Sequence, residues 1–154
     1  MAKKTQPLYY VLLGGAGIFL AGRYLLRKGE AVKSLNVNVT GVDFNKANFG
    51  FVVKVRLINP SNASIEIKSI VADAIWNGTY AATVSYLTPF TLKPLEERTI
   101  QIPVKANLEW YQLILQAITK GTKALNGTFE LKGSVNALGL VVPLTYKNTF
   151  DIIK

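Results

Sequence analysis

From about residue 33 to the end of the chain, apolar and polar residues alternate in short runs. Clear examples are residues 35–40, 51–58, 100–105 and 129–135. In an extended strand successive side chains point to opposite faces, so each run has one apolar face and one polar face. Residues 65–76 and 140–152 add further strand length. The pattern predicts half-buried strands and therefore a mainly β domain.

Residues with strong turn preferences separate these runs. Asn77-Gly78 predicts a tight hairpin between residues 65–76 and 79–87. We expect Asn59-Pro60-Ser61-Asn62 to end one strand and Lys93-Pro94-Leu95-Glu96-Glu97 to form another turn. Asn126-Gly127 and Leu138-Gly139 complete the set of predicted turns. Short strands at regular spacing indicate an antiparallel β-sandwich.

One segment of the sandwich region has a helical pattern instead. Residues 107–120 begin at Asn107, a fair N-cap residue, and carry a wide apolar arc. We expect this amphipathic helix to cover one end or edge of the sandwich. The alternative is that its apolar residues form a partner or membrane surface, with Trp110, Tyr111 and Ile114 as the candidate contacts.

The N-terminal part of the chain contains a long uncharged run. Leu8–Gly22 has no charged residue, and the run extends to Leu26 if the side chain of Arg23 reaches the membrane surface. Nineteen helical residues span about 28 Å, close to the thickness of a hydrocarbon core. We therefore predict a single transmembrane helix at about residues 8–26, a membrane anchor over residues 1–32 and a sandwich domain over residues 33–154. The residues expected at the membrane interfaces are Tyr9, Tyr10, Arg23, Tyr24, Arg27 and Lys28.

The glycines of this run could belong to three kinds of site. A dinucleotide-binding loop is excluded because Leu20 stands where the third glycine is needed and no strand precedes it. A processing site is excluded because neither a signal-peptidase pattern nor a lipoprotein cysteine follows. What remains is a small-residue stripe of Gly14, Gly17 and Ala21, on which another membrane helix could pack. The alternative is that these glycines have no specific role, since glycine is common in membrane helices.

The basic residues are concentrated around the apolar run. The net charge is +9, and residues 1–34 hold six basic residues against one acidic residue. This distribution favours a membrane segment with basic flanks over a surface that reads nucleic acid. The C-terminal flank is the more basic, which favours a sandwich on the cytoplasmic or interior side of the membrane.

The residues needed for most catalytic chemistry are missing. The chain has no Cys and no His, which excludes thiol nucleophiles, disulfides and imidazole catalysis. Glu96 and Glu97 are adjacent on a turn, and adjacent side chains point apart, so they do not form an acid–base pair. We therefore predict no catalytic residues, no metal, no cofactor and no small-molecule substrate.

The region from about Val39 to Ile152 resembles the late-embryogenesis-abundant group 2 domain, also called the water-stress and hypersensitive-response domain. The resemblance rests on the segments "VTGVDF", "FGFVVKVRLINPSNASIEIKSIVADAIWNGTYAATV", "FTLKPLEERTIQIPVKANL" and "GTFELKGSVNALGLVVPLTYKNTFDI". It implies a seven-stranded sandwich similar to fibronectin type III and immunoglobulin domains, with one helix. It also implies a single N-terminal membrane helix and no catalysis.

Two functions are compatible with these features. The first is a non-enzymatic, single-pass membrane protein that tethers a larger assembly to a bilayer, as in a virion with an internal membrane. Its partners would be the bilayer and other proteins of that assembly. The second is a binding module of a cellular or bacterial envelope, which would take a partner protein or an apolar ligand.

Overall fold

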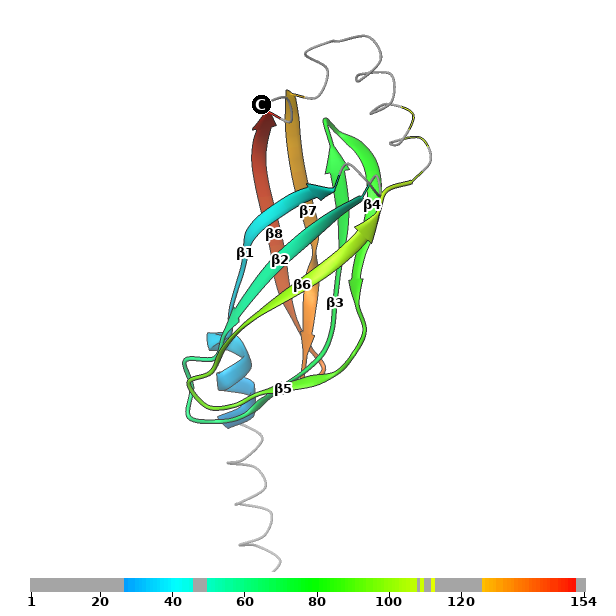
Figure 1. Cartoon of the computed structure of the whole chain (residues 1–154). Coiled ribbons are helices and arrows are strands. Elements are labelled where there is room, and N and C mark those ends of the chain that lie inside the picture. Colours follow the sequence, from blue (N-terminus) through cyan, green and yellow to red (C-terminus); the bar gives the residue numbers. More distant parts are fainter. Residues whose placement is uncertain (1–26, 46–49, 108, 110–111, 113–125, 152–154) are drawn as a thin grey trace, which may run out of the picture.

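The protein forms an elongated β-sandwich of two antiparallel sheets (Figure 1). The computed structural model describes residues 27–45, 50–107, 109, 112 and 126–151. Within these residues a short helix at residues 27–34 precedes eight strands. The strands are β1 (Asn36–Asn45), β2 (Gly50–Ile58), β3 (Ile65–Trp76), β4 (Thr79–Tyr86), β5 (Phe90–Leu92), β6 (Glu97–Lys105), β7 (Asn126–Ala137) and β8 (Leu140–Asp151).

The strands are divided unequally between the two sheets. One sheet has the order β1-β2-β6, and the other has the order β4-β3-β7-β8, with β5 paired to the first residues of β3. The predicted antiparallel sandwich is therefore confirmed. The predicted number of seven strands is wrong, because β5 adds an eighth. β5 has three residues, which is too short to give a visible alternation.

The predicted turns are confirmed at four of five positions. Asn77-Gly78 joins β3 to β4 and Leu138-Gly139 joins β7 to β8, each with two positive φ angles (47° and 81°, 53° and 82°). Asn126-Gly127 is not a turn, because both residues begin β7. A Cβ on Gly127 would lie 2.6 Å from the side-chain amide of Asn77. This glycine therefore permits close packing of the strand against the hairpin and does not reverse the chain.

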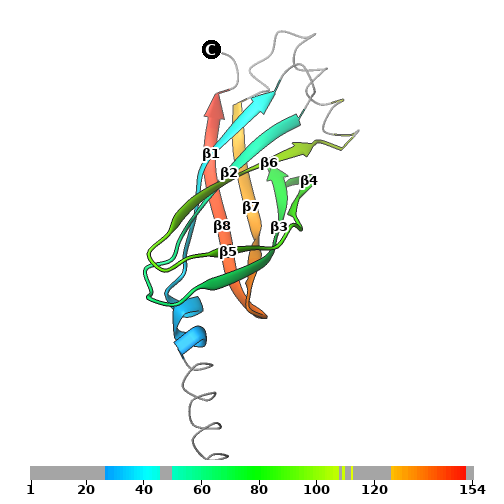
Figure 2. The ribbon, with the colours of Figure 1, turned by 60° about the horizontal axis from the view of Figure 1, so that its bottom comes forward.

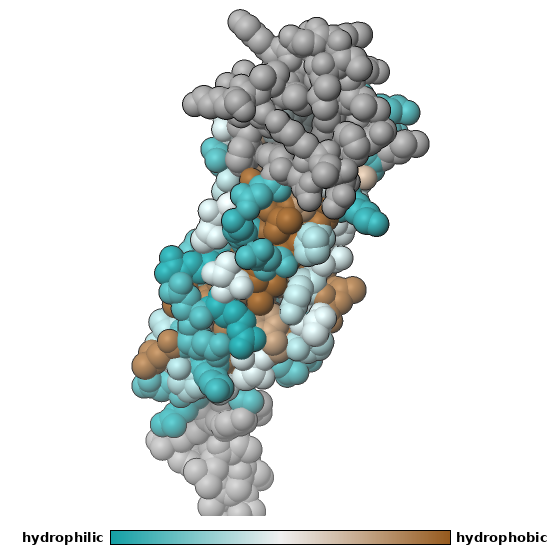
Figure 3. Space-filling model, in the orientation of Figure 1, coloured by the Kyte–Doolittle hydropathy of each residue, from teal (hydrophilic) through white to brown (hydrophobic). Residues whose placement is uncertain are grey.

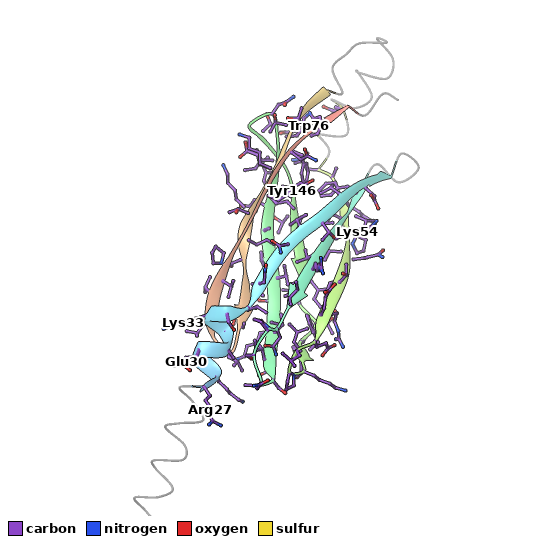
Figure 4. The ribbon with its side chains drawn as sticks, turned by 90° about the vertical axis from the view of Figure 1, so that its left-hand side faces the viewer. Arg27, Glu30, Lys33, Lys54, Trp76 and Tyr146 are labelled. Carbon is purple, nitrogen blue, oxygen red and sulfur yellow. The ribbon has the colours of Figure 1, made fainter. Side chains whose placement is uncertain are left out.

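The hydrophobic core lies between the two sheets. The alternating residues of β2 point inward as predicted, with Phe51, Val53 and Val55 at most 1% exposed, and those of β3 alternate in the same way. The Phe51 and Phe129 rings meet edge to face across the sheets, with their centroids 5.3 Å apart. The Tyr146 ring extends this contact to β8, 6.5 Å from Phe129 (Figure 4). The contact between Phe51 and Phe129 thus occupies the space between the sheets at this level.

The short helix packs against one end of this core. Ala31 and Val32 are each 2% exposed and Leu35 is 6% exposed. The Leu35 amide donates to the Val32 carbonyl at 3.1 Å, which turns the chain directly into β1. The predicted boundary between anchor and sandwich, at residues 32 and 33, falls inside this helix.

Two other predicted helices fall mainly outside the described residues. The predicted span at residues 8–26 lies entirely outside them, and no helix within them is both long and apolar enough to cross a membrane. Of the predicted helix at 107–120, the structure describes Asn107, Glu109 and Gln112, and the last two are helical.

Candidate functional site

Three turns and the short helix meet at one end of the sandwich, which we call the helix-bearing pole. Its turns are residues 59–64 between β2 and β3, residues 93–96 between β5 and β6, and residues 138–139 between β7 and β8. The strand register brings them together, because Asn36 pairs with Ile58, Ile65 with Leu92, and Ile67 with Ala137. Figures 1 and 2 show the helix and these turns at the same end from two directions.

Asn59 holds two of these turns together. It is the one buried polar side chain among the described residues, with an exposed fraction of 0%. Its amide nitrogen donates to the carbonyl oxygens of Ala63 and Lys93, both at 2.8 Å. Its amide oxygen accepts from the Ser61 amide at 3.1 Å and from the Ser61 hydroxyl at 2.7 Å. The Asn-Pro motif therefore has a structural role, since each polar atom of the buried amide is satisfied.

The turn at residues 93–96 is fixed from both sides. The Leu95 amide donates to the Ser61 carbonyl at 3.2 Å, and the Lys93 amide donates to the Glu96 carboxylate at 2.6 Å. Leu95 has a φ of 58°, which is rare for a residue with a side chain. The leucine side chain is thus presented to solvent by a well-supported backbone, and it is 70% exposed.

The helix-bearing pole carries further exposed hydrophobic side chains. Val141 is 69% exposed and Leu140 is 45% exposed, and both follow the turn between β7 and β8. That turn is tied to the start of β3 by a hydrogen bond from the Leu138 amide to the Glu66 carbonyl at 3.0 Å. Half of the six large hydrophobic residues that are exposed in the described chain therefore lie on a turn of this pole or directly after one.

The same pole carries an excess of positive charge. Arg27 and Lys33 are exposed on the helix, Lys28 is half-buried and Lys93 is exposed on the turn. Figure 4 shows Arg27, Glu30 and Lys33 along the helix, at the opposite end of the sandwich from Trp76. Glu30 offsets one of the four cations. Glu66 and Lys68, at the start of β3, contribute one charge of each sign.

The two adjacent glutamates at this pole pair with different cations. The Glu96 carboxylate lies 3.1 Å from the Arg98 guanidinium, and the Glu97 carboxylate lies 2.7 Å from the Arg56 guanidinium. The hydrogen bond from the Lys93 amide lowers the pKa of Glu96. The hydrogen bond from Arg56 lowers the pKa of Glu97. Both groups are therefore anionic at neutral pH and engaged in structural contacts.

Most of the site residues predicted from the sequence lie outside the described residues. These are Tyr9, Tyr10, Gly14, Gly17, Ala21, Arg23, Tyr24, Trp110, Tyr111 and Ile114. Arg27 and Lys28 are described, and both lie on the docked helix. Within the part of the chain that the structure describes, no three Asp or Glu residues gather closely enough to hold a metal ion.

The exposed leucines and valine of the helix-bearing pole were not among the predicted site residues. Leu95, Leu140 and Val141 each occupy a turn or a strand end, where alternation does not predict which side chains are exposed. The docking of the helix did leave a signal: Ala31, Val32 and Leu35 stand at positions i, i+1 and i+4, among charged and polar residues.

Known proteins share this fold. The solution structure of a protein from Arabidopsis thaliana matches with a TM-score of 0.59 and 21% identity, over 75% of this chain and 80% of that one. A crystal structure of a protein from Archaeoglobus fulgidus matches with a TM-score of 0.50 and 15% identity, over 76% of this chain and 92% of that one. The solution structure of a protein described as late embryogenesis abundant matches with a TM-score of 0.52 and 15% identity, over 93% of this chain and 88% of that one. These similarities establish the fold alone.

The sequence also matches a family model. A comparison with curated proteins found no match. The model for the Tag1-like fifth LEA-2 like domain matches residues 49–145, from the start of β2 into β8. This region includes the Asn59 turn and most of both sheets. The chain therefore belongs to the LEA-2-like domain family.

Proposed function

We propose that this protein is a non-enzymatic, single-pass membrane protein whose sandwich is held against the bilayer as an interaction module. In this proposal residues 8–26 span the membrane and the helix at residues 27–34 joins the span to the sandwich. The sandwich offers its surfaces to other proteins of an assembly. The more basic C-terminal flank favours a sandwich on the cytoplasmic or interior side.

The docked helix is the observation that carries the proposal. Its first described residue, Arg27, directly follows the apolar run. Its residues Ala31 and Val32 are buried in the sandwich core. A flexible linker would let the sandwich move freely on its anchor. A helix packed into the core would instead hold the sandwich at a fixed distance from the membrane.

The surface of the sandwich is consistent with a position outside the hydrocarbon core. Hydrophilic side chains cover much of the described face in Figure 3. Ion pairs lie on both sheets, such as Lys54 with Asp43 on one and Lys147 with Glu130 on the other. Charged groups are costly inside a bilayer, so this part of the chain belongs in water.

The stripe of Gly14, Gly17 and Ala21 is the proposed contact for a neighbouring membrane helix. Small residues at this spacing permit close approach of two helices. Replacing Gly17 with Leu would block that approach, so we expect the G17L variant to stay in the membrane and to lose cross-linking to its neighbour. Unchanged cross-linking would mean that the stripe has no specific role.

An apolar ligand between the sheets is the less favoured function. The Phe51 and Phe129 rings already contact each other there, where such a ligand would have to lie. The choice between a virion membrane and a cellular envelope does not alter the proposal, because both require the same single-pass anchor. A specific water-stress role is likewise not part of it.

Alkaline carbonate extraction of membranes that contain the full chain tests the proposal. We expect the protein to remain with the membranes. A double variant L13R and I18R places two charges in the span, each costing about 2.5–3.5 kcal/mol at the centre of a membrane helix, so it should be released. The matched control, L13I and I18L, keeps the span apolar and should be retained. Release of the unmodified protein would overturn the proposal.

A further inference from the structure

The helix-bearing pole presents hydrophobic turns and cations on the side where the proposed membrane span enters the sandwich. We infer that Leu95, Leu140 and Val141 enter the interfacial layer of that bilayer, and that the cations around them bind anionic lipid headgroups. This inference rests on the proposed anchor. It adds a second membrane contact, which would fix the orientation of the sandwich.

The first argument is the distance of the turns from the span. The described helix has eight residues and is therefore about 12 Å long. In Figure 1 the three turns lie at the level of this helix, at the same end of the sandwich. The polar layer on each side of a bilayer is about 5–8 Å thick. Side chains on these turns are thus within reach of that layer if the span ends near residue 26.

The second argument is how these side chains are held. Leu95 is 70% exposed although the buried Asn59 amide and the Ser61 carbonyl both fix its turn. Val141 is 69% exposed as the second residue of β8, just after a hairpin turn whose Leu138 amide is bonded to β3. Both side chains therefore project from supported backbone. A bilayer interface would bury this apolar surface without a further ordering of the backbone.

The third argument is the charge around them. Arg27, Lys33 and Lys93 are exposed and form no salt bridge within 4.0 Å among the described residues, although the charge of Lys93 acts on the Glu96 carboxylate of the same turn. With Lys28 they make four cations on the helix and the 93–96 turn, against two acidic residues, Glu30 and Glu96. Cations beside exposed apolar side chains are typical of segments that bind anionic membrane surfaces.

A depth measurement on the full chain tests this contact. The protein has no cysteine, so one introduced cysteine can carry an environment-sensitive fluorophore at a chosen position. Labels would be placed at L95C and V141C on the helix-bearing pole. The matched control is L87C, because Leu87 is 67% exposed but lies away from the three turns, next to the pair Tyr86 and Ile70 near the middle of β3. Thr79, at the opposite end of β3, supplies a second control as T79C.

The probe is a vesicle of phosphatidylcholine and phosphatidylserine that contains a lipid with a shallow spin-label quencher. We expect the labels at positions 95 and 141 to lose most of their emission and to shift to the blue, while those at 87 and 79 keep theirs. We expect weaker quenching in phosphatidylcholine alone. Equal quenching in both lipids would overturn the role of the cations.

Flotation of the same samples separates the two proposals. If the protein floats with the vesicles after carbonate treatment but positions 95 and 141 are not quenched, the contact is wrong and the anchor stands. If the protein does not float, both are wrong. Blue-shifted emission at positions 95 and 141 without lipid quenching would assign the surface to a second copy of the chain or another protein, which also contradicts the lipid contact.

Discussion

The side-chain amide of Asn59 donates a hydrogen bond of 2.8 Å to the backbone carbonyl of Lys93, thirty-four residues later in the chain. This contact joins the turn after β2 to the turn before β6. It therefore supports the backbone from which Leu95 projects. The buried amide links the one motif-like element of the sequence to the surface for which we propose a membrane contact.

Replacing Asn59 with Ala should destabilise the sandwich by about 2–3 kcal/mol. The substitution removes four hydrogen bonds and leaves the carbonyls of Ala63 and Lys93 without their buried donor. Urea unfolding followed by circular dichroism measures the change. The control is N62A, since Asn62 is exposed in the same turn and its loss should change stability by less than about 0.5 kcal/mol. Equal effects of the two variants would refute the role of the buried amide.

Replacing Val32 with Ala should lower the free energy of unfolding by about 1–3 kcal/mol. Val32 is 2% exposed where the helix packs into the core, and the shorter side chain leaves a cavity. Limited proteolysis should also cut residues 27–35 faster. K33A changes the next, exposed residue and serves as the control. A stable V32A variant with unchanged proteolysis would mean that the helix is not docked.

Replacing Gly133 with Ala should destabilise the five-stranded sheet by about 1–3 kcal/mol or more. A Cβ at this position would collide with the backbone of Val71 and Ala72 on β3. Gly41 is the matched control, because its nearest atom to a new Cβ is the Lys54 Cδ at 3.8 Å. Thermal unfolding should therefore separate G133A from G41A. If the two variants unfold at the same temperature, β3 and β7 are not as close as described.

Lowering the pH should destabilise the five-stranded sheet, because it protonates the Glu130 carboxylate. Its carboxylate lies 3.0 Å from the Lys132 ammonium and 3.1 Å from the Lys147 ammonium, and these bonds lower its pKa below the ordinary 4.5. A carboxyl with a lowered native pKa stabilises the fold above its unfolded pKa and loses that contribution as the pH falls. The free energy of unfolding should therefore fall below about pH 4.5, and less steeply in E130Q. An identical fall in E130Q would exclude the contribution of Glu130.

The sequence was sufficient to predict the sandwich and most of its turns. The alternation of Phe51, Val53 and Val55 determines which face of β2 is buried. A shift of the strand register by one residue would expose that face to solvent. Asn77-Gly78 favours the tight hairpin that the structure contains. These features are local, so neighbouring residues are enough to identify them.

The missed features depend on contacts between distant residues. β5 is a strand because it pairs with the start of β3, and Gly127 packs against a hairpin fifty residues earlier. Leu95 and Val141 share a pole because two sheets place their turns there. The residues next to these positions in the sequence do not predict such contacts.

Energy transfer to the bilayer tests most directly the claim that the docked helix holds the sandwich upright on the membrane. The full chain would be placed in vesicles with acceptor-labelled headgroups, with a donor at N62C on the helix-bearing pole or at T79C on the opposite pole. β3 alone, twelve residues long, separates these poles by about 40 Å. We predict much stronger transfer from position 62 than from position 79, and loss of the difference when V32D releases the helix. Equal transfer from both positions in the unmodified sandwich would contradict the account.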